Sequence, residues 1–450
     1  MPPEPGTNPE PSPSSLPSAT GPHSAPQPSV RSSGQAAPRR TAPPRHTSSL
    51  PWRQTFVSLG EKSFQRLWLG TLFMMAGVQS QQLVRSYLVY DMTDSAFLLG
   101  VVNAASALPM LFLSLFGGAL ADRLDRKRLI QAGQGAIMVI AVAVAVLVYT
   151  GTVQWWHILI ASALQGAMFS FVAPARQSII PELVGKDRLG NAVAMTAAAM
   201  SAMTFAAPAM AGVLYAVIGP GHVFMLIGLT MLIAMVLTAS IPATAARLKP
   251  KNAMMADIKA GMSYIRRTPI VLVLLGVGLS TVMLIMPFRF LLPVFVVDVY
   301  HRESGSLGLL LSILGLGSLA GSIGVAAIGR KNRGLLLIMG GFAAGISMLL
   351  IALIPIYYVA AVIMLALGLS DAGHKAINLA LVMENSDEQF RGRVVSVWML
   401  NWGLMPLGML PMSLAIDLLG DRLAIGIIAG IVLAMSVAIM LTQKKLRALQ

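Results

Sequence analysis

The chain has 450 residues, of which 56% are hydrophobic and only 11% charged, and its formal charge at pH 7 is +15. This number of charged residues is too small to cover the surface of a soluble protein of this size. The composition therefore excludes a soluble enzyme and indicates an integral membrane protein. The basic residues fall between apolar runs rather than on one face of a helix, which argues against a nucleic-acid partner.

Residues 1–60 are rich in Pro, Ser, Ala and Gly and have no apolar periodicity. Such a segment cannot bury enough surface to fold, so the sequence predicts a disordered cytoplasmic tail. No apolar core lies near the start, which argues against a secretory signal.

Twelve apolar runs follow from Leu67 onward, each long enough to cross the ~30 Å hydrocarbon layer as a helix. Helices are required because lipid offers no partner to a free backbone N–H or C=O group. The sequence therefore predicts an all-α membrane protein with twelve transmembrane helices near 67–90, 96–120, 128–149, 155–177, 191–217, 222–242, 269–297, 306–329, 335–354, 357–382, 394–417 and 423–441.

The distribution of lysine and arginine predicts the orientation of these helices. Most of the 33 basic residues fall in alternate connections, and the other connections hold only Arg302 and Arg422. Because basic residues favour the cytoplasmic side, we expect a multi-pass protein of the cell membrane with both termini in the cytoplasm.

The longest connection, 243–268, contains a short amphipathic helix near 256–267 and divides the chain into two sets of six helices. The charged turns at 182–191 and 383–392 hold the same ordinal place in the two sets. We therefore expect two pseudo-symmetric six-helix bundles, 61–242 and 269–443, followed by a cytoplasmic tail at 444–450, with a substrate site between the bundles.

The stretch from Gly118 to Arg128 reads Gly-Ala-Leu-Ala-Asp-Arg-Leu-Asp-Arg-Lys-Arg. It resembles the signature loop of the major facilitator superfamily, with Asp125 in place of the usual glycine. Residues 88–93, 174–184, 264–269 and 391–394 resemble the branch that includes the enterobactin exporter and macrolide efflux proteins. The resemblance covers roughly residues 60–445 and implies the major facilitator fold.

The resemblance also implies that the signature loop is a cytoplasmic gate. In the family, the aspartate and the basic residues hold the cytoplasmic side shut, and an acidic side chain suits a helix N-terminus. The alternative is that the bases only fix topology. The residues that the gating role assigns are Gly118, Asp122, Arg123, Arg126 and Lys127.

Two arginines fall deep inside predicted helices. Arg85 has Gln81 and Gln82 about one turn before it, and Arg289 holds a comparable place in the first helix of the second set. A buried arginine is costly unless it faces water or a partner, so we expect these four residues to bind substrate in a positively charged central cavity. The alternative is that each arginine bonds backbone carbonyl groups or reaches the membrane surface.

Asp371, His374 and Lys375 lie within five residues of one helix. The i,i+4 spacing lets Asp371 and Lys375 pair, and a carboxylate with a basic partner can carry out a proton-coupled step. The alternative is a self-neutralised pair with a purely structural role.

The stretch that contains Pro208 and Gly212 resembles the antiporter motif of the family but lacks some of its glycines. These two residues can bend a helix and allow a neighbouring helix to approach closely. No cysteine is present, and nothing resembles a nucleotide-binding loop, a metal cluster or a nucleophile with its base. We expect neither an enzyme nor a cofactor or metal, and coupling to an ion gradient rather than ATP hydrolysis.

The sequence thus favours a proton-driven exporter of small amphipathic or partly anionic compounds, of the drug or siderophore type, in the cell inner membrane. Its expected partners are the small-molecule substrate, protons and membrane lipids, with no nucleic acid, and the expected state is a monomer. Two alternatives stay open: a lysophospholipid flippase that uses Arg176, and a receptor or scaffold that keeps the fold without transporting.

Overall fold

The computed structural model describes residues 57–121, 125–242, 254–328 and 332–449, and most of the predicted N-terminal tail lies outside these ranges. Within them the chain is almost entirely helical and has no β-strand. The elements are η1 (Val57–Gly60), α2 (Lys62–Thr93), α3 (Ala96–Ala121), α4 (Arg126–Tyr149), α5 (Trp155–Ala239), α6 (Met254–Arg267), α7 (Pro269–Leu284), α8 (Met286–Val294), η2 (Phe295–Val299), α9 (Ser304–Ile328), α10 (Arg333–Leu353), α11 (Tyr357–Glu384), α12 (Glu388–Leu400), η3 (Asn401–Leu404), α13 (Pro406–Leu419), α14 (Asp421–Thr442) and α15 (Lys444–Arg447).

Nine helical stretches within the described residues are long and apolar enough to cross a membrane. The 32-residue α2 is not among them, because it carries more polar side chains, and α13 has only 14 residues. The count of twelve crossings therefore stays a prediction.

The long helix α5 turns sharply at two glycines. Gly185 has φ 71° and Gly219 has φ 78°, values that residues with a side chain rarely adopt. These turns divide α5 into three helical segments, where the sequence predicts three separate crossings. The expected connection at 178–190 is largely helical, because one glycine makes the turn by itself.

The crossing predicted over 269–297 is broken after α7. Ile285 separates α7 from α8, Pro287 and Pro293 lack the N–H group that a continuous helix needs, and a π-helical turn follows at η2. In the same way, η3 and Pro406 separate α12 from α13. The first of these breaks places Arg289 on the short helix α8.

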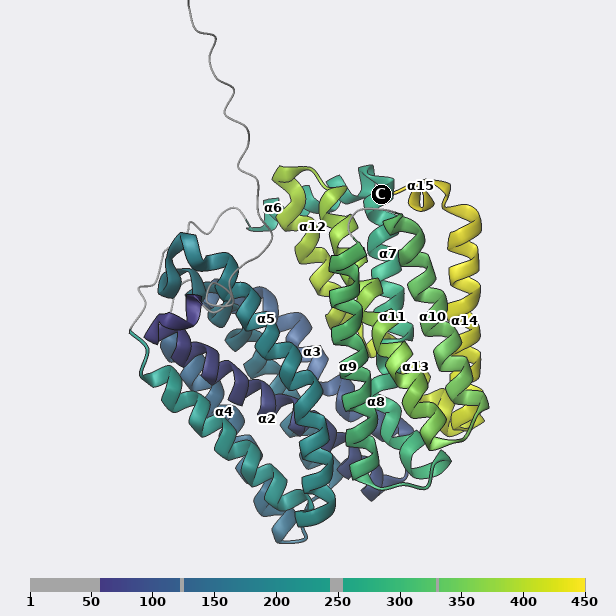
Figure 1. Cartoon of the computed structure of the whole chain (residues 1–450). Coiled ribbons are helices and arrows are strands. Elements are labelled where there is room, and N and C mark those ends of the chain that lie inside the picture. Colours follow the sequence, from purple (N-terminus) through teal and green to yellow (C-terminus); the bar gives the residue numbers. More distant parts are fainter. Residues whose placement is uncertain (1–56, 122–124, 243–253, 329–331, 450) are drawn as a thin grey trace, which may run out of the picture. The chain divides into compact units, whose positions relative to one another are not determined.

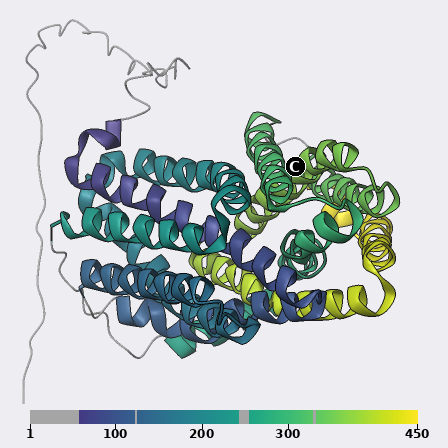
Figure 2. The ribbon, with the colours of Figure 1, turned by 90° about the horizontal axis from the view of Figure 1, so that it is seen from below.

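Two groups of helices pack internally. In the first, α2, α3 and α4 contact α5; in the second, α11 contacts α9 and α10, and α10 contacts α14 (Figure 1). The two groups meet where α5 contacts α9 and where α3 contacts α13, and the view from below shows early helices beside late ones (Figure 2). The amphipathic helix expected in the long connection is present as α6.

The hydrophobic core differs between the two ends of the helices. At the end marked by Tyr90, Tyr300 and Tyr357, which we call the tyrosine end, one core cluster contains residues of both groups. At the opposite end, marked by Arg126 and Arg333 and called the arginine end, the first group has its own clusters and the second group has another. Among the residues that the structure describes, the one core cluster with members from both groups therefore extends from the tyrosine end.

Candidate functional site

Arg85 lies inside the first group of helices, with only 5% of its surface exposed. Its Nη1 donates to Oε1 of Gln165 on α5 at 3.3 Å, and its Nη2 donates to Oδ1 of Asn103 on α3 at 3.2 Å. The hydroxyl of Ser86 donates to the same oxygen of Asn103 at 3.2 Å. Neutral amide oxygens thus hold the guanidinium in place, and nothing in the sequence distinguishes Asn103 and Gln165 as its partners.

The two glutamines beside Arg85 have different surroundings. Gln81 is 2% exposed, and its Oε1 is buried without a hydrogen-bond partner in the described part of the chain. Gln82, one residue further, lines a small cavity together with Ser86. This difference arises because successive residues of a helix point about 100° apart.

The cavity at Gln82 lies where the two groups of helices meet. Its other walls include Pro208 of α5, Arg289 of α8 and Leu307 of α9. Nε of Arg289 is buried and has no hydrogen-bond partner among the described residues. The walls of the cavity thus include the side chains of Arg289 and Gln82, and a guanidinium beside an amide suits an anionic or hydrogen-bond-accepting group.

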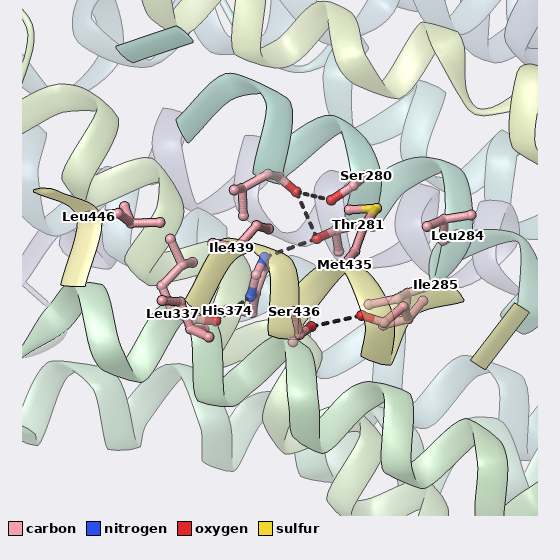
Figure 3. Close-up of a pocket in the computed structure, with 14 residues that line it drawn as sticks. Ser280, Thr281, Leu284, Ile285, Leu337, His374, Met435, Ser436, Ile439 and Leu446 are labelled. Atoms are coloured by element: carbon pink, nitrogen blue, oxygen red, sulfur yellow. Dashed lines mark hydrogen bonds between the residues drawn. The ribbon is translucent and has the colours of Figure 1, made fainter. Parts of the chain in front are cut away.

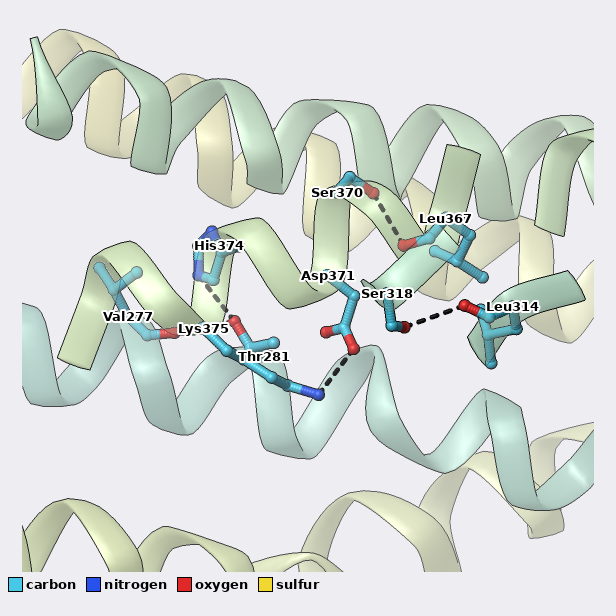
Figure 4. A network of polar contacts seen from close by, with 9 residues as sticks. All are labelled: Val277, Thr281, Leu314, Ser318, Leu367, Ser370, Asp371, His374 and Lys375. Carbon is cyan, nitrogen blue, oxygen red and sulfur yellow. Dashed lines mark hydrogen bonds and ion pairs between the residues drawn. The ribbon is translucent and has the colours of Figure 1, made fainter. Parts of the chain in front are cut away.

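Asp371 and Lys375 form the ion pair that their spacing predicts (Figure 4). Nζ of Lys375 lies 2.7 Å from Oδ2 of Asp371, and the two side chains are 24% and 22% exposed. Oδ1 of Asp371 is buried without a hydrogen-bond partner in the described ranges. The pair is thus partly accessible, and its carboxylate has a second oxygen that can accept a proton or a donor.

His374 is buried on the same helix but makes its hydrogen bonds elsewhere. Its Nδ1 lies 2.8 Å from the carbonyl oxygen of Leu337 on α10, and its Nε2 lies 2.9 Å from the hydroxyl of Thr281 on α7. Figure 4 shows His374 joined to Thr281 while Asp371 and Lys375 reach toward each other. The histidine is therefore not a hydrogen-bonding member of the ion pair.

A polar network beside these residues was missed by the sequence analysis. Nε1 of Trp398 donates to Oδ1 of Asn378 at 2.7 Å, and Nδ2 of Asn378 donates to the carbonyl oxygen of Leu274 at 2.9 Å. Gly278 allows this approach, since a Cβ there would lie 2.9 Å from Oδ1 of Asn378. The signal that could have revealed it is the i,i+4 spacing of His374 and Asn378 on one face of α11.

The expected gate is described only in part, because Asp122 and Arg123 lie outside the described residues and Gly118 is described only as part of α3. Arg126 pairs with Glu182 of α5, so its partner lies in the same group of helices. Nζ of Lys127 donates to the carbonyl oxygen of Ile241 at 2.7 Å, again in that group.

Pro208 and Gly212 lie where α5 contacts α9. A Cβ at Gly212 would stand 2.6 Å from the carbonyl oxygen of Ser304, and a Cβ at Gly308 would stand 2.6 Å from that of Pro208. The two backbones are therefore in direct contact, while α5 stays helical through Pro208. Glycine at both positions is what permits this close contact between the groups.

Two carboxylates of the second group bind the first group at the tyrosine end. The hydroxyl of Tyr90 donates to Asp298. Asp417 of α13 accepts from the hydroxyl of Ser95 at 2.8 Å and from the backbone N–H groups of Ala96 at 2.8 Å and Phe97 at 3.1 Å, so it caps the N-terminus of α3. The sequence does not predict these contacts, because the partners are more than 200 residues apart.

Arg176 is also buried, and it is a structural residue. Its Nη2 donates to the carbonyl oxygen of Leu67 at 2.9 Å and to the hydroxyl of Thr71. Its partners therefore belong to α2. Among the described residues, no cluster of His, Asp and Glu could hold a metal ion.

Comparison with known proteins supports a transporter. Residues 53–450 match a family model described as transmembrane secretion effector. The chain is 25% identical over 351 residues to the staphyloferrin A transporter of Staphylococcus aureus, covering 75% of this chain and 86% of the relative. It is 24% identical over 367 residues to macrolide efflux protein A of Streptococcus pyogenes (79% and 90% covered) and 23% identical over 310 residues to the enterobactin exporter EntS of Shigella boydii (68% and 74% covered).

Solved structures agree on the fold. A peptide transporter of the POT family superposes with a TM-score of 0.73 at 13% identity, covering 90% of this chain and all of the other. The nucleoside transporter NupG superposes with a TM-score of 0.71 at 10% identity, covering 84% of this chain and 99% of the other. The match of the family model over residues 53–450 shows the family, and the chain belongs to the transmembrane secretion effectors of the major facilitator superfamily, which are multi-pass membrane transporters and not enzymes.

Proposed function

We propose that this protein is a proton-coupled exporter of small amphipathic, partly anionic compounds. The observation that carries the proposal is Arg289, whose guanidinium lines a cavity between the two groups of helices and keeps a buried donor without a partner among the described residues. An unpaired buried donor is costly, and an anionic group of a substrate would satisfy it. The relatives that export a siderophore and a macrolide support this substrate class.

The direction of access follows from the core and the positive-inside rule. The groups share a core at the tyrosine end and keep separate cores at the arginine end. If the basic connections are cytoplasmic, with both termini inside, the structure faces inward and receives its substrate from the cytoplasm. Alternating access then requires the contacts of Asp298 and Asp417 to break at the tyrosine end while the signature loop closes the arginine end.

Asp371 and Lys375 are the residues that we assign to proton coupling. Arg289 on α8 and the ion pair on α11 both lie in the second group of helices, and we propose that the charge of Asp371 acts on Arg289. Protonation of Asp371 releases Lys375 and removes the negative charge that balances Arg289, so proton binding and anion binding are linked.

Everted membrane vesicles test this proposal with two fluorescent dyes of matched size, one anionic and one cationic. With a proton gradient, Arg289→Gln is expected to lower anionic dye uptake about tenfold, the effect of losing one charge-assisted hydrogen bond. The cationic dye should be much less affected. Arg302→Gln, which makes the same change at an exposed position of the tyrosine end, is the control.

Other outcomes separate the remaining readings. The proposal would be overturned if Arg289→Gln and Asp371→Asn took up both dyes as the unchanged protein does, with and without a proton gradient. That result would favour a receptor or scaffold. Movement of a labelled lysophospholipid without movement of either dye would favour a flippase, although Arg176 is bound inside the protein and does not support that reading. Membrane lipids as partners and the monomeric state are part of the same proposal.

A further inference from the structure

A second cavity lies within the second group of helices, between α7, α10, α11 and α14 (Figure 3). Its volume is about 30 Å³, which is room for about two water molecules. Ser280, Thr281 and Ser436 line it together with His374. The hydroxyls of Ser280 and Ser436 already donate to carbonyl groups of their own helices, so their lone pairs remain available to water. The cavity is therefore both polar enough and large enough to be hydrated.

His374 is arranged to accept a proton there. The carbonyl oxygen of Leu337 can only accept, so Nδ1 of His374 carries the hydrogen. In the neutral ring, Nε2 accepts the hydrogen of the Thr281 hydroxyl at 2.9 Å. When Nε2 is protonated it donates to Thr281, whose hydrogen turns to the carbonyl oxygen of Val277 at 3.2 Å. Both protonation states are thus hydrogen-bonded without movement of the heavy atoms.

The charged residues beside His374 on its own helix are Asp371 and Lys375. Lys375 lines a neighbouring small cavity that His374 also lines. Among the described residues, α7, α10 and α14 present only hydroxyl and apolar side chains to this cavity. His374 thus makes its hydrogen bonds to Leu337 and Thr281 and not to the ion pair. Asp371 and Lys375 are still close to it on the same helix.

One wall of the cavity comes from the segment 444–449. Leu446 of α15 is 0% exposed and lines the cavity, and Figure 3 shows it at one edge of the lining residues, away from Ile285. The segment is docked on the start of α10, where the N–H of Gly334 donates to the carbonyl oxygen of Leu449 at 3.1 Å. A Cβ at Gly334 would lie 1.8 Å from the carbonyl oxygen of Leu446, so the docked position requires glycine.

We propose that this cavity is a hydrated proton-binding site centred on Nε2 of His374, and that residues 444–449 form a removable plug at its arginine end. The inference rests on the proposed proton coupling and adds a second proton site to it. A hydronium ion that enters the cavity gives its proton to the hydroxyl oxygen of Thr281, and the hydrogen that this hydroxyl already carries passes to Nε2. The hydronium ion leaves as water, and the reverse transfer returns the proton. Displacement of Leu446 opens this route.

The natural absence of cysteine allows the plug to be tested by labelling. Ser436→Cys places a reporter on the cavity wall, and its reaction rate with a small methanethiosulfonate reagent is measured in the full-length protein. Gly334→Ala adds one methyl group that suits a helix but collides with the docked segment. It is expected to raise the labelling rate at least about tenfold, because access follows local opening.

Gly430→Ala is the matched control, since its new Cβ would meet nothing within 4 Å. Leu446→Ala should also raise the rate, and Ser280→Cys provides a second reporter if Ser436→Cys folds poorly. Equal rates in Gly334→Ala, Leu446→Ala and the control, at either reporter, would overturn the plug.

Nitrogen NMR of histidine-labelled protein tests the proton site, with the signal assigned by its loss in His374→Gln. We expect the Nε2 signal of His374 to change as the pH is varied, and its exchange with water to quicken in Gly334→Ala. A signal that stays constant over the whole pH range in which the protein remains folded would overturn the proton site. Neither measurement uses a substrate, so both remain informative even if the proposed transport fails.

Discussion

The cap that Asp417 provides for α3 should decide how firmly the tyrosine end is closed. Asp417 lies near the C-terminus of α13, where a negative charge is unfavourable to its own helix. Across the contact it accepts three hydrogen bonds at the N-terminus of α3. The side chain is therefore placed to stabilise the contact between the two groups of helices rather than α13.

The size of this effect follows from the geometry. Loss of a helix N-cap costs about 0.5–2 kcal/mol, and the exposed position of Asp417 lowers the charge contribution. Because the hydrogen bonds exist only when the tyrosine end is closed, Asp417→Ala should favour the open state by about 0.5–2 kcal/mol. This corresponds to an increase of about 2- to 30-fold in the ratio of open to closed molecules.

Distance measurements between spin labels can detect this shift. Thr152→Cys and Ile356→Cys place labels on exposed connections at the tyrosine end of the two groups, in a chain that has no other cysteine. In lipid nanodiscs, Asp417→Ala should add a population at longer distance, and Asp417→Asn, which keeps one acceptor oxygen, should add less. Glu303→Ala removes another exposed carboxylate at the same end and is the control. Identical distance distributions for Asp417→Ala and Glu303→Ala would refute the reasoning.

Three further changes test the packing of the helices. Gly308→Ala should lower the midpoint of thermal unfolding, since its new Cβ would lie 2.6 Å from a backbone atom and overpacking costs about 1–3 kcal/mol. Gly276→Ala has open space around it and should leave the midpoint unchanged. Equal midpoints for the two variants would contradict this prediction. Arg126→Gln leaves its carboxylate partner unpaired and should lower the same midpoint, unlike Arg128→Gln, whose side chain is 85% exposed; comparable losses would refute the difference. Trp398→Phe removes the donor of a 2.7 Å hydrogen bond to a buried amide and should cost about 1–3 kcal/mol in chemical unfolding; no loss would show that water replaces the indole.

The sequence predicts the helices better than the turns between them. Long apolar runs require helices in lipid, so the runs and their order correspond closely to the structure. The connection expected before residue 191 is instead a one-residue turn at Gly185. A charged segment reads as a loop in the sequence, but at a membrane surface it can continue as a helix, and only the backbone angle of a single glycine then shows where the chain turns.

The candidate site was predictable where partners are local. The pairing of Asp371 with Lys375 follows from four residues of separation on one helix. The partners of Arg85, Asn103 and Gln165, are 18 and 80 residues away. Nothing in the sequence distinguishes them from other polar residues within apolar runs. Burial of the arginine was therefore predictable from its cost in lipid, but the identity of its partners depends on how the helices pack.

The two central arginines differ in a way that bears on the proposed transport cycle. All the hydrogen-bond partners described for Arg85 lie in its own group of helices, so they move with it if that group rotates as a body, and its hydrogen bonds survive the change of access. Arg289 instead faces a cavity whose walls come from both groups, and in the proposed cycle the charge of Asp371, which we propose acts on it, is neutralised by a proton. Rotation and protonation therefore both change the surroundings of Arg289, while they leave those of Arg85 nearly constant. Since a ligand can shift an equilibrium only by binding two states differently, the coupling of substrate, proton and conformation should depend on Arg289 rather than on Arg85.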